Sequence, residues 1–340
     1  MLVLGIETTC DETAASVVKD GVEVLSNVIY SQGEFHSKFK GVIPELACRK
    51  HLDVIITVIE EALVKAGTTL DEIDVIAAAR GPGLIGALLV GLNTAKALAF
   101  AMKKPFIGVN HLEAHLYAAM MPNFPSSFPC LGLILSGGHT ALLHIEEVRQ
   151  YRILGTTVDD AIGEAFDKVA SLLGLPYPGG PFIENLAKDG DPYKYSFKAG
   201  QVKKNPLDFS FSGLKTNVLY SIKGQNQQNA HPEELTETEK KDLAASFQRA
   251  AFSDIVNKTL LAADHNPYHA IIFGGGVCSN KSLKKMFEEA FPNMPQYWPG
   301  KGMASDNAAM IAGLGYHQYV QQNSRDSFYL KALPKIPYLI

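Results

Sequence analysis

The sequence predicts an α/β protein built from two facing lobes, each with a mixed sheet and flanking helices. At 340 residues the chain exceeds the roughly 100 to 200 residues of a usual domain, so it has room for two hydrophobic cores. Its hydrophobic content of 46% and its 29 glycines are typical of a globular protein with many tight turns. Short apolar runs alternate with helical patterns along the chain, which favours an α/β fold.

The apolar runs have the lengths of strands, and the patterns between them have the period of helices. Strands are predicted at 2–6, 14–18, 22–30, 73–79, 131–135, 141–146, 151–156 and 270–273. Helices are predicted at 44–66, 84–102, 161–174, 240–263, 278–290 and 305–320. The first of these helices has Pro44 at its start and Gly67 directly after its end, which are favoured positions for proline and glycine.

The order of these elements repeats once. LVLGIETTCDETAASVV followed by VEVLSNVIY reads as strand, polar turn, strand, strand, and CLGLILSGGHTALLHIE followed by YRILGTT reads the same way. Two such β-β-β-α-β-α units form the architecture shared by actin, hexokinase and the seventy-kilodalton heat-shock ATPases, in which the first hairpin turn of each lobe holds phosphate groups. The prolines of MPNFPSSFP place the lobes at 1–125 and 126–340, with the last helix free to pack back on the first lobe.

The net charge and the cysteines limit the possible binding partners and cellular location of the protein. A net charge of −4 argues against a generally basic surface, so a nucleic-acid contact would need a local patch such as Lys203/Lys204 or Lys284/Lys285. The scattered cysteines form no CxxC pair, which predicts free thiols and a cytoplasmic location: Cys10, Cys48, Cys130 and Cys278. The run 84–102 contains Asn93, Thr94 and Lys96, and it predicts a buried helix rather than a membrane span.

The stretch NHLEAHLYA at 110–118 raises the question of a metal site. At about 100° per residue, His111 and His115 share one helix face, so both imidazoles can reach one ion, although two packed histidines fit the same spacing. Glu113 lies about 200° around the helix from His111, which excludes the H-E-x-x-H geometry of a zinc protease. Asp306 either caps a helix or completes the histidine site if the two lobes face one another.

Two turns carry polar groups that suit a ligand. In LSGGHT, Ser136, Gly137 and Gly138 can offer backbone N–H groups and a hydroxyl to a phosphate, or they can form an ordinary glycine hairpin. In the matching turn of the first lobe, Asp11 and Glu12 join Glu7 as more carboxylates than a hairpin needs, and they are candidates for catalysis or positioning.

Two further segments can likewise be interpreted either as ligand contacts or as ordinary structural features. In IIFGGGVCSN, Asn280 follows a triple glycine at a helix start, which favours either a ligand contact or a tight strand-to-helix turn. In GEAFDK, Glu164 and Asp167 precede the PGGP turn at 178–181, where carboxylates can bind ribose hydroxyls or simply face solvent.

Taken together, these motifs closely resemble the TsaD family, bacterial tRNA N6-adenosine threonylcarbamoyltransferases that were formerly called O-sialoglycoprotein endopeptidases or glycoproteases. The resemblance covers nearly the whole chain in fixed order. It is carried by GIETTCDET, PELA, ARGPGLIGALLVG, NHLEAHL, LSGGHT, DDAIGEAFDKVASLLGLPYPGGP, DFSFSGLKT, GGGVCSN and SDNAAMIA.

The resemblance implies a set of site residues. A divalent metal, Fe²⁺ with Zn²⁺ as the alternative, would be bound by His111, His115 and Asp306. The threonylcarbamoyl-adenylate pocket would be lined by Ile134, Leu135, Ser136, Gly137, Gly138, Asp167, Gly180, Glu184 and Asn280. Apart from the resemblance, we hypothesise that Asp11 or Glu12 assists removal of a proton from the amine that attacks the donor.

The resemblance also implies a reaction and its partners. The threonylcarbamoyl group would pass from threonylcarbamoyl-AMP to N6 of adenosine 37 in tRNAs that read codons starting with A, with release of AMP. Partner proteins similar to TsaB and TsaE, and a donor made by a TsaC-like enzyme, would be required, and no membrane would be involved. The alternative is an ATPase or sugar-kinase-like enzyme of the same fold, or a non-catalytic scaffold.

Overall fold

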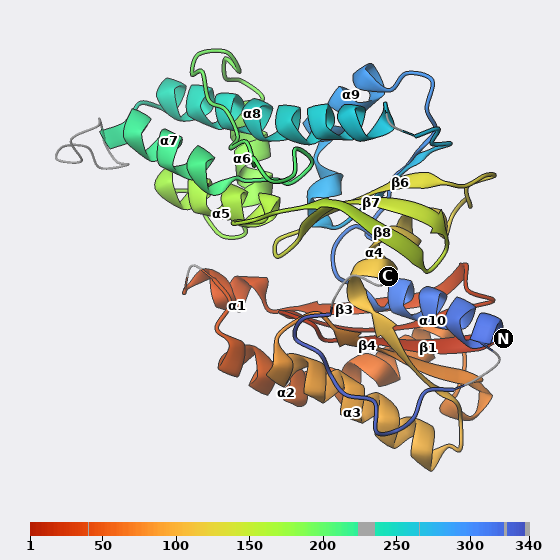
Figure 1. Cartoon of the computed structure of the whole chain (residues 1–340). Coiled ribbons are helices and arrows are strands. Elements are labelled where there is room, and N and C mark those ends of the chain that lie inside the picture. The colour runs from red at the N-terminus through yellow and green to blue at the C-terminus, as the bar shows by residue number, and fades with distance from the viewer. Residues whose placement is uncertain (40, 224–234, 265, 323–324, 337–340) are drawn as a thin grey trace. The chain divides into compact units, whose positions relative to one another are not determined.

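The computed structural model describes residues 1–39, 41–223, 235–264, 266–322 and 325–336. The chain divides into two compact units (Figure 1). Unit 1 comprises Met1–Pro125 together with the segment that starts at Trp298, and unit 2 comprises Ser126–Tyr297. The C-terminal helix therefore packs within unit 1 although it follows unit 2 in the sequence.

Unit 1 is built on a five-stranded mixed sheet. Its spatial order is β3 (Glu23–Ser31), β2 (Glu12–Lys19), β1 (Leu2–Glu7), β4 (Val75–Gly81) and β5 (Phe106–Asn110). The first three strands form an antiparallel meander, and β4 and β5 continue from β1 in parallel. The three central strands are buried almost throughout, as their continuous Val, Ile and Ala runs predict.

Helices cover both faces of this sheet (Figure 1). The unit contains α1 (Gly33–Ser37), α2 (Pro44–Ala66), η1 (Leu70–Glu72), α3 (Ile85–Ala101), α4 (His111–Met120) and α10 (Ala308–Gln322). On one face, α2 and α3 bury a core that includes Leu4, Ile6 and Ile55. On the other face, α10 contacts β1, β2 and β4 and also packs against α4.

Gly5 explains how closely α10 approaches the sheet. A Cβ at this position would lie 2.3 Å from the carbonyl oxygen of Ala308 and 2.7 Å from the backbone nitrogen of Ala312. Because neither of these backbone atoms can move aside cheaply, only glycine allows the helix to lie directly on β1. This contact places the residues just before α10 over the carboxyl end of β1.

Unit 2 repeats the same sheet. Its spatial order is β8 (Gln150–Thr156), β7 (Thr140–Glu147), β6 (Cys130–Leu135), β9 (Ile271–Gly274) and β10 (Gln296–Tyr297). Again three antiparallel strands are followed by two parallel ones. Its helices are α5 (Ile162–Leu172), α6 (Gly179–Ala187), α7 (Ser212–Lys223), α8 (Glu237–Ala263), η3 (Gly276–Ser279) and α9 (Lys281–Ala290).

The identical strand order of the two sheets confirms the predicted internal repeat. All eight predicted strands and all six predicted helices are present, with their ends shifted by a few residues, and 110–118 is helical as expected. The strands β5 and β10 and the helices α1, α6 and α7 were not predicted. The two strands are short, and α6 begins with two glycines, which are poor helix formers.

The described helices do not include a candidate membrane span, because none is both long and apolar enough to cross a bilayer. The run 84–102 forms α3, whose buried side includes Leu88, Leu92 and Ala95 in the core of unit 1.

Asp159 joins two segments of unit 2. Its carboxylate accepts hydrogen bonds from the Phe211 backbone N–H at 2.8 Å and from the Ser210 and Ser212 hydroxyls at 2.6 and 2.8 Å. It also lies 3.3 Å from the Ser212 N–H, so it acts as a cap for α7 from a distant part of the chain. Desolvation raises the pKa of this carboxyl, but the hydrogen bonds outweigh it and hold the pKa below its usual value.

We therefore expect Asp159→Ala to lower the stability of unit 2 by about 1 kcal/mol at pH 7, as loss of a helix cap does. Because the folded-state pKa is lowered, the contribution is complete above the unfolded pKa of about 3.9 and is lost as the pH falls through the folded value. Urea unfolding midpoints at pH 7 and pH 3 measure this difference. An equal gap between the two proteins at both pH values would contradict the role of the charge.

Candidate functional site

The first candidate site is built on α4. Asn110 precedes the helix, and its side-chain oxygen accepts the N–H groups of Leu112 at 2.9 Å and Glu113 at 3.4 Å, which fixes the first turn. His111 and His115 then lie one turn apart with ring centroids separated by 4.6 Å. They are 6% and 1% exposed, so neither belongs to a solvated helix face.

Asp306 completes a cluster with these two histidines. Its Oδ1 atom lies 3.2 Å from His115 Nε2 and 3.6 Å from His111 Nε2, and the three possible ligand atoms lie within 4.8 Å of one another. All three residues belong to unit 1. The expectation that Asp306 reaches the histidines only if two lobes face one another is therefore wrong, because α10 returns to the sheet of unit 1.

The helix-cap interpretation of Asp306 is also wrong. It is Asn307 whose side-chain oxygen accepts the Met310 N–H, at 3.1 Å, at the start of α10. Asn307 is fully buried, and its amide nitrogen also donates to the carbonyls of Ser305 and Met303. Asp306 is thereby released from capping and directed toward the histidines.

Glu7 and Thr9 support the histidine side of the cluster. Glu7 is fully buried at the end of β1, and its Oε2 atom lies 2.9 Å from His111 Nδ1. Its other oxygen accepts the Thr9 N–H at 2.5 Å, so the carboxylate is held at both ends. A carboxylate on Nδ1 keeps the proton on that nitrogen, so Nε2 is the ring nitrogen that can serve as a metal ligand. The hydroxyl of Thr9 lies 3.5 Å from Asp306 Oδ2.

The electrostatics of the cluster favour a cation. Burial alone would lower the pKa of His111, but the charges of Glu7 and Asp306 raise it to about 9. Burial would raise the pKa of Asp306, but His111, His115 and the Thr9 hydroxyl hold it well below its usual range. A buried group of two carboxylates around two imidazoles thus stabilises positive charge at the point where the three ligand atoms converge.

Asp11 lies in the turn that follows Glu7, and Glu12 is the first residue of β2. Burial, the charges of Asp306 and Asp11, and a hydrogen bond with Asp11 raise the pKa of Glu12 to about 9. Ser31 donates its hydroxyl to Glu12 Oε1 at 3.1 Å, which is a smaller and opposite effect. Glu12 is therefore protonated at neutral pH and can donate to Asp11.

The second candidate site lies in unit 2 around the end of β6. Ile134 and Leu135 are buried in the strand, so only their backbone can contact a ligand. Ser136 closes the following turn, since its N–H donates to the His139 carbonyl at 2.9 Å and its Oγ accepts the His139 N–H at 3.1 Å. Gly137 and Gly138 are exposed at its tip with open space beside them.

Close backbone packing links this turn to its neighbours. A Cβ on Gly163, in the first turn of α5, would lie 2.7 Å from the Ser136 carbonyl oxygen. A Cβ on Gly275, where φ is +101°, would lie 2.4 Å from the Leu135 carbonyl oxygen. The triple-glycine turn after β9 and the start of α5 therefore meet at the carboxyl end of β6, where backbone N–H groups gather.

The other predicted contacts in unit 2 already bind backbone groups. Asp167 accepts the Gly179 N–H at 2.7 Å at the start of α6, and Gly180 beside it has open space. Glu184 accepts the Lys281 N–H at 2.9 Å at the start of α9. Asn280, 7% exposed, caps α9 by accepting the Ser282 N–H at 2.9 Å. Each residue therefore has a structural role, since Asp167 joins the middle of α5 to the start of α6 and Glu184 joins α6 to the start of α9.

Sequence reasoning missed the roles of Glu7, Thr9 and Asn307. Glu7 was noted only as an extra carboxylate in its turn, because its partner His111 lies 104 residues away. The signal that could have found it is a carboxylate at the end of an otherwise apolar strand, where burial without a cationic partner would be costly.

The sequence of this chain is similar to those of known proteins. The family model described as "tRNA N6-adenosine threonylcarbamoyltransferase", TsaD, matches residues 23–313. The chain belongs to the TsaD family. A curated relative of this name from Protochlamydia amoebophila is 59% identical over 99% of the chain and 98% of its own length. Relatives of the same name from Chlamydia felis and Symbiobacterium thermophilum are each 47% identical, over 95% and 98% of the chain and 93% and 96% of their own lengths.

Solved structures with low sequence identity share the fold of this TsaD chain. Full-length HypF, in a phosphate- and nucleotide-bound form, aligns over 95% of the chain and 47% of its own length with a TM-score of 0.62 and 14% identity. Component A of (R)-2-hydroxyglutaryl-CoA dehydratase from Acidaminococcus fermentans aligns over 94% and 99% with a TM-score of 0.52 and 14% identity. These similarities confirm the predicted fold class, with two mixed sheets and flanking helices.

The residues of this TsaD chain fit a divalent metal. Two imidazole nitrogens and one carboxylate oxygen are ligands that Zn²⁺ and Fe²⁺ both accept, and such a set leaves positions open for a substrate. The Glu7 carboxylate behind His111 is the outer-shell partner that metal-binding histidines usually have.

We expect Glu7→Gln to weaken metal binding about tenfold, because the neutral amide orients His111 less firmly and adds no negative charge. Glu45→Gln is the matched control, since Glu45 lies on α2 in the same unit and its side chain is 75% exposed. Competition with a chromogenic chelator measures the affinity, and thermal unfolding shows whether both variants fold. Equal metal affinity in Glu7→Gln and the control would show that Glu7 does not support the site.

Proposed function

We propose that this chain transfers the threonylcarbamoyl group of threonylcarbamoyl-AMP to N6 of adenosine 37 in tRNAs that read codons starting with A. The proposal rests on two observations. The chain aligns over nearly its whole length with curated tRNA N6-adenosine threonylcarbamoyltransferases, and it contains the cluster of His111, His115 and Asp306. In the reaction the exocyclic amine attacks the carbamoyl carbonyl carbon. A C–N bond forms, the C–O bond to the phosphate breaks, and AMP leaves while the amine loses a proton.

The ion at His111, His115 and Asp306 is proposed to be Fe²⁺, with Zn²⁺ as the alternative. When bound, it supplies a Lewis acid that can polarise the carbonyl or hold the threonyl portion. The two imidazole nitrogens in the ligand set support a first-row transition metal over Mg²⁺ or Ca²⁺, which prefer all-oxygen sites.

The donor's adenylate is proposed to bind in unit 2, at the turns around β6 and β9. Within the described residues, the N–H groups of Gly137 and Gly138 donate no hydrogen bond, so they are free to contact a phosphate. The start of α5, where Gly163 packs against Ser136 and Gly137, adds partial positive charge for the same anion. Asp167, Gly180, Glu184 and Asn280 are proposed to contact the rest of the adenylate.

Asp11 is proposed as the group that accepts the proton of the attacking amine. Burial is the main cause that raises the pKa of Glu12 to about 9, followed by the charges of Asp306 and Asp11, so Glu12 is protonated at neutral pH. A protonated Glu12 can donate to Asp11 and hold it in place, so the roles of the two carboxyls differ even though both were predicted as candidate bases.

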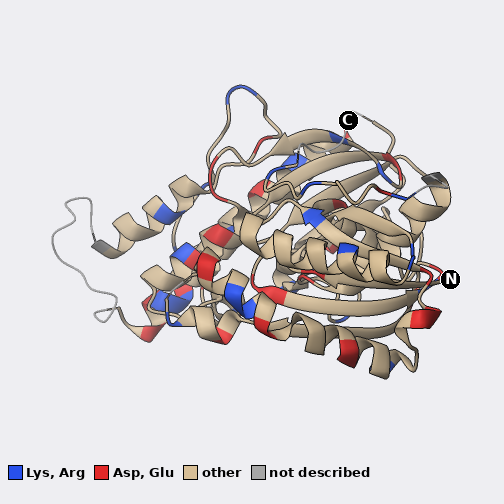
Figure 2. Cartoon of the chain, turned by 90° about the horizontal axis from the view of Figure 1, so that it is seen from below, with Lys and Arg blue, Asp and Glu red and all other residues tan. Residues whose placement is uncertain are grey.

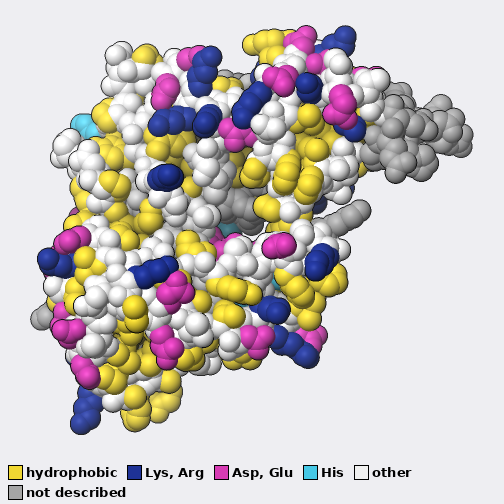
Figure 3. Space-filling model, turned by 180° about the vertical axis from the view of Figure 1, so that it is seen from behind, with side chains coloured by type: hydrophobic (Ala, Val, Ile, Leu, Met, Phe, Trp, Pro, Cys, Tyr) yellow, Lys and Arg dark blue, Asp and Glu magenta, His cyan; other side chains and the backbone are white. Residues whose placement is uncertain are grey.

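A protein partner similar to TsaB is proposed to bind unit 1. Large apolar side chains of α2 and α3 are exposed: Leu52, Ile56, Val64, Ile85, Leu89 and Phe100 at 62%, 54%, 78%, 48%, 44% and 74%. Figure 3 shows hydrophobic side chains exposed among charged ones on the face that it draws. An apolar helix face of this kind fits an interface with another protein. A TsaE-like partner, a TsaC-like source of the donor and a cytoplasmic location remain predictions from the sequence.

The proposed function is tested by transfer of labelled threonine into a tRNA that reads ANN codons, with the partner proteins and donor-forming enzyme added one at a time. We expect incorporation only when this chain is present. ATP turnover without tRNA, and no incorporation under any combination, would favour an ATPase or sugar-kinase-like enzyme of the same fold.

Substitution of one candidate metal ligand tests the proposed function more directly. His115→Ala removes a ligand, and we expect it to lower both bound metal and transfer by at least about 100-fold, since the two remaining ligands hold an ion weakly. His269→Ala is the matched control, because His269 is an exposed histidine of unit 2. Transfer at the full rate by a His115→Ala protein that lacks metal would contradict the role of the ion.

A further inference from the structure

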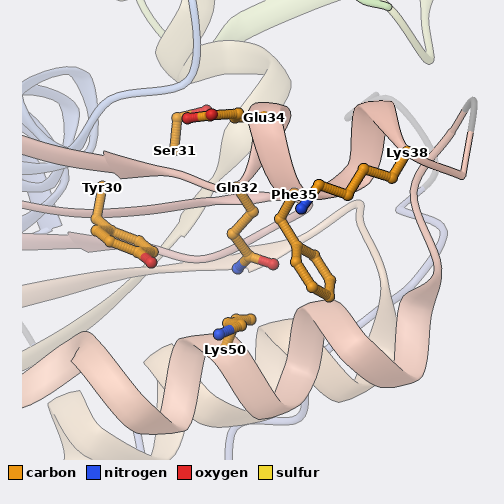
Figure 4. Close-up of a pocket in the computed structure, with 7 residues that line it drawn as sticks. All are labelled: Tyr30, Ser31, Gln32, Glu34, Phe35, Lys38 and Lys50. Atoms are coloured by element: carbon orange, nitrogen blue, oxygen red, sulfur yellow. The ribbon is translucent and has the colours of Figure 1, made fainter.

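A pocket of about 240 Å³ opens in unit 1 between the end of β3, the short helix α1 and the first part of α2 (Figure 4). Tyr30 and Gln32 reach it from the β3 side, Phe35 and Lys38 from α1 and the residue after it, and Lys50 from α2. The volume of about 240 Å³ is smaller than the roughly 300 to 1,000 Å³ of a drug-sized site, so the pocket suits part of a single nucleotide rather than a whole cofactor.

The walls combine aromatic rings with cations. Tyr30 is 41% exposed, and Lys50 Nζ lies 5.3 Å from the centre of the Phe35 ring. Within the described part of the chain, neither Lys38 nor Lys50 forms an ion pair with a carboxylate. Glu34 also lines the pocket, which leaves an excess of one positive charge. Aromatic faces beside unpaired lysines are the usual surface for unstacked nucleotides.

The floor of the pocket is fixed. Gln32 is 2% exposed, and its side-chain nitrogen donates to the Ala47 carbonyl at 3.3 Å. Its side-chain oxygen lies 3.1 Å from Nε2 of the fully buried His36, which therefore links α1 to the strand. These bonds tie β3, α1 and α2 together, so the pocket does not need to form when a ligand arrives.

The pocket adjoins the turn that carries the candidate base. The Gln32 N–H donates to the Asp11 carbonyl at 3.0 Å, and the Ser31 hydroxyl donates to Glu12 at 3.1 Å. The same turn follows Glu7, whose carboxylate lies 2.9 Å from His111 Nδ1. A ligand in the pocket would thus lie beside the residues that lead to the metal cluster, within the same unit.

We propose that this pocket binds an unpaired nucleotide of the tRNA that neighbours the reacting adenosine, with its base on Tyr30 and its phosphates near Lys38 and Lys50. The inference rests on the proposed function and names the part of the substrate that unit 1 grips. The chain is acidic overall, and its two signs of charge alternate over the helices in Figure 2, so tRNA contact depends on local patches such as this one.

The test measures tRNA binding and transfer for the full chain with its partner proteins. We expect Lys38→Ala with Lys50→Ala to raise the tRNA Kd about tenfold and to reduce the slope of log Kd against log salt by about 1.4, as loss of two single-strand phosphate contacts does. Tyr30→Ala raises the Kd by about tenfold through lost stacking, and Tyr30→Phe restores it. The KM for threonylcarbamoyl-AMP, the bound metal and the thermal unfolding temperature stay unchanged.

Lys19→Ala is the matched control, because Lys19 is a half-exposed lysine at the opposite end of β2. Unchanged tRNA Kd and salt slope in the double lysine variant would overturn the proposal, and so would a rise in the donor KM instead of the tRNA KM. Failure of the unmodified chain to transfer any threonine would instead refute the proposed function. The two failures are distinguishable because tRNA binding is measured without the donor.

Discussion

The packing of α10 on β1 is the constraint on which the rest of unit 1 depends. Gly5 lets the helix backbone lie against the strand, and Glu7, two residues further along the same strand, holds Nδ1 of His111. Asp306 lies just before α10, so the position of the helix also sets the distance from this carboxylate to both histidines. One strand therefore positions ligands that come from residues 111 and 306, and a shift of α10 would separate them.

The alternation of apolar runs and helical patterns was enough to predict the fold, because buried strands and amphipathic helices leave different periods in a sequence. The repeat was also visible, since both sheets use the same order of three antiparallel and two parallel strands. The sequence allowed α10 to return to unit 1 but did not require it. This return depends on close contacts that a Cβ would block at Gly5, Gly313 and Gly315, and no periodic pattern reports such contacts.

The candidate site was also predictable in part, because local spacing could be read from the sequence but tertiary packing could not. Helical spacing brings His111 and His115 together without further information, whereas the distance from Asp306 to them is set by tertiary packing. The position next to Asp306 decides its role, because Asn307 takes the capping bond and leaves the carboxylate free. For Asn280 the outcome is reversed, since its side chain caps α9 while its family pattern points to substrate. Residue type alone cannot separate these cases, because both residues can cap a helix.

The two equivalent hairpin turns favour ligands of opposite charge. In unit 1 the turn between β1 and β2 follows Glu7, whose charge, with that of Asp306, raises the pKa of His111 and favours a cation at the histidines. In unit 2 the turn between β6 and β7 has Gly137 and Gly138 at its tip, where free N–H groups and nearby helix starts favour an anion. A phosphate would be repelled by the first turn and a metal ion would find no ligand side chain at the tip of the second. The same backbone element, used twice, thus favours a cation in unit 1 and an anion in unit 2.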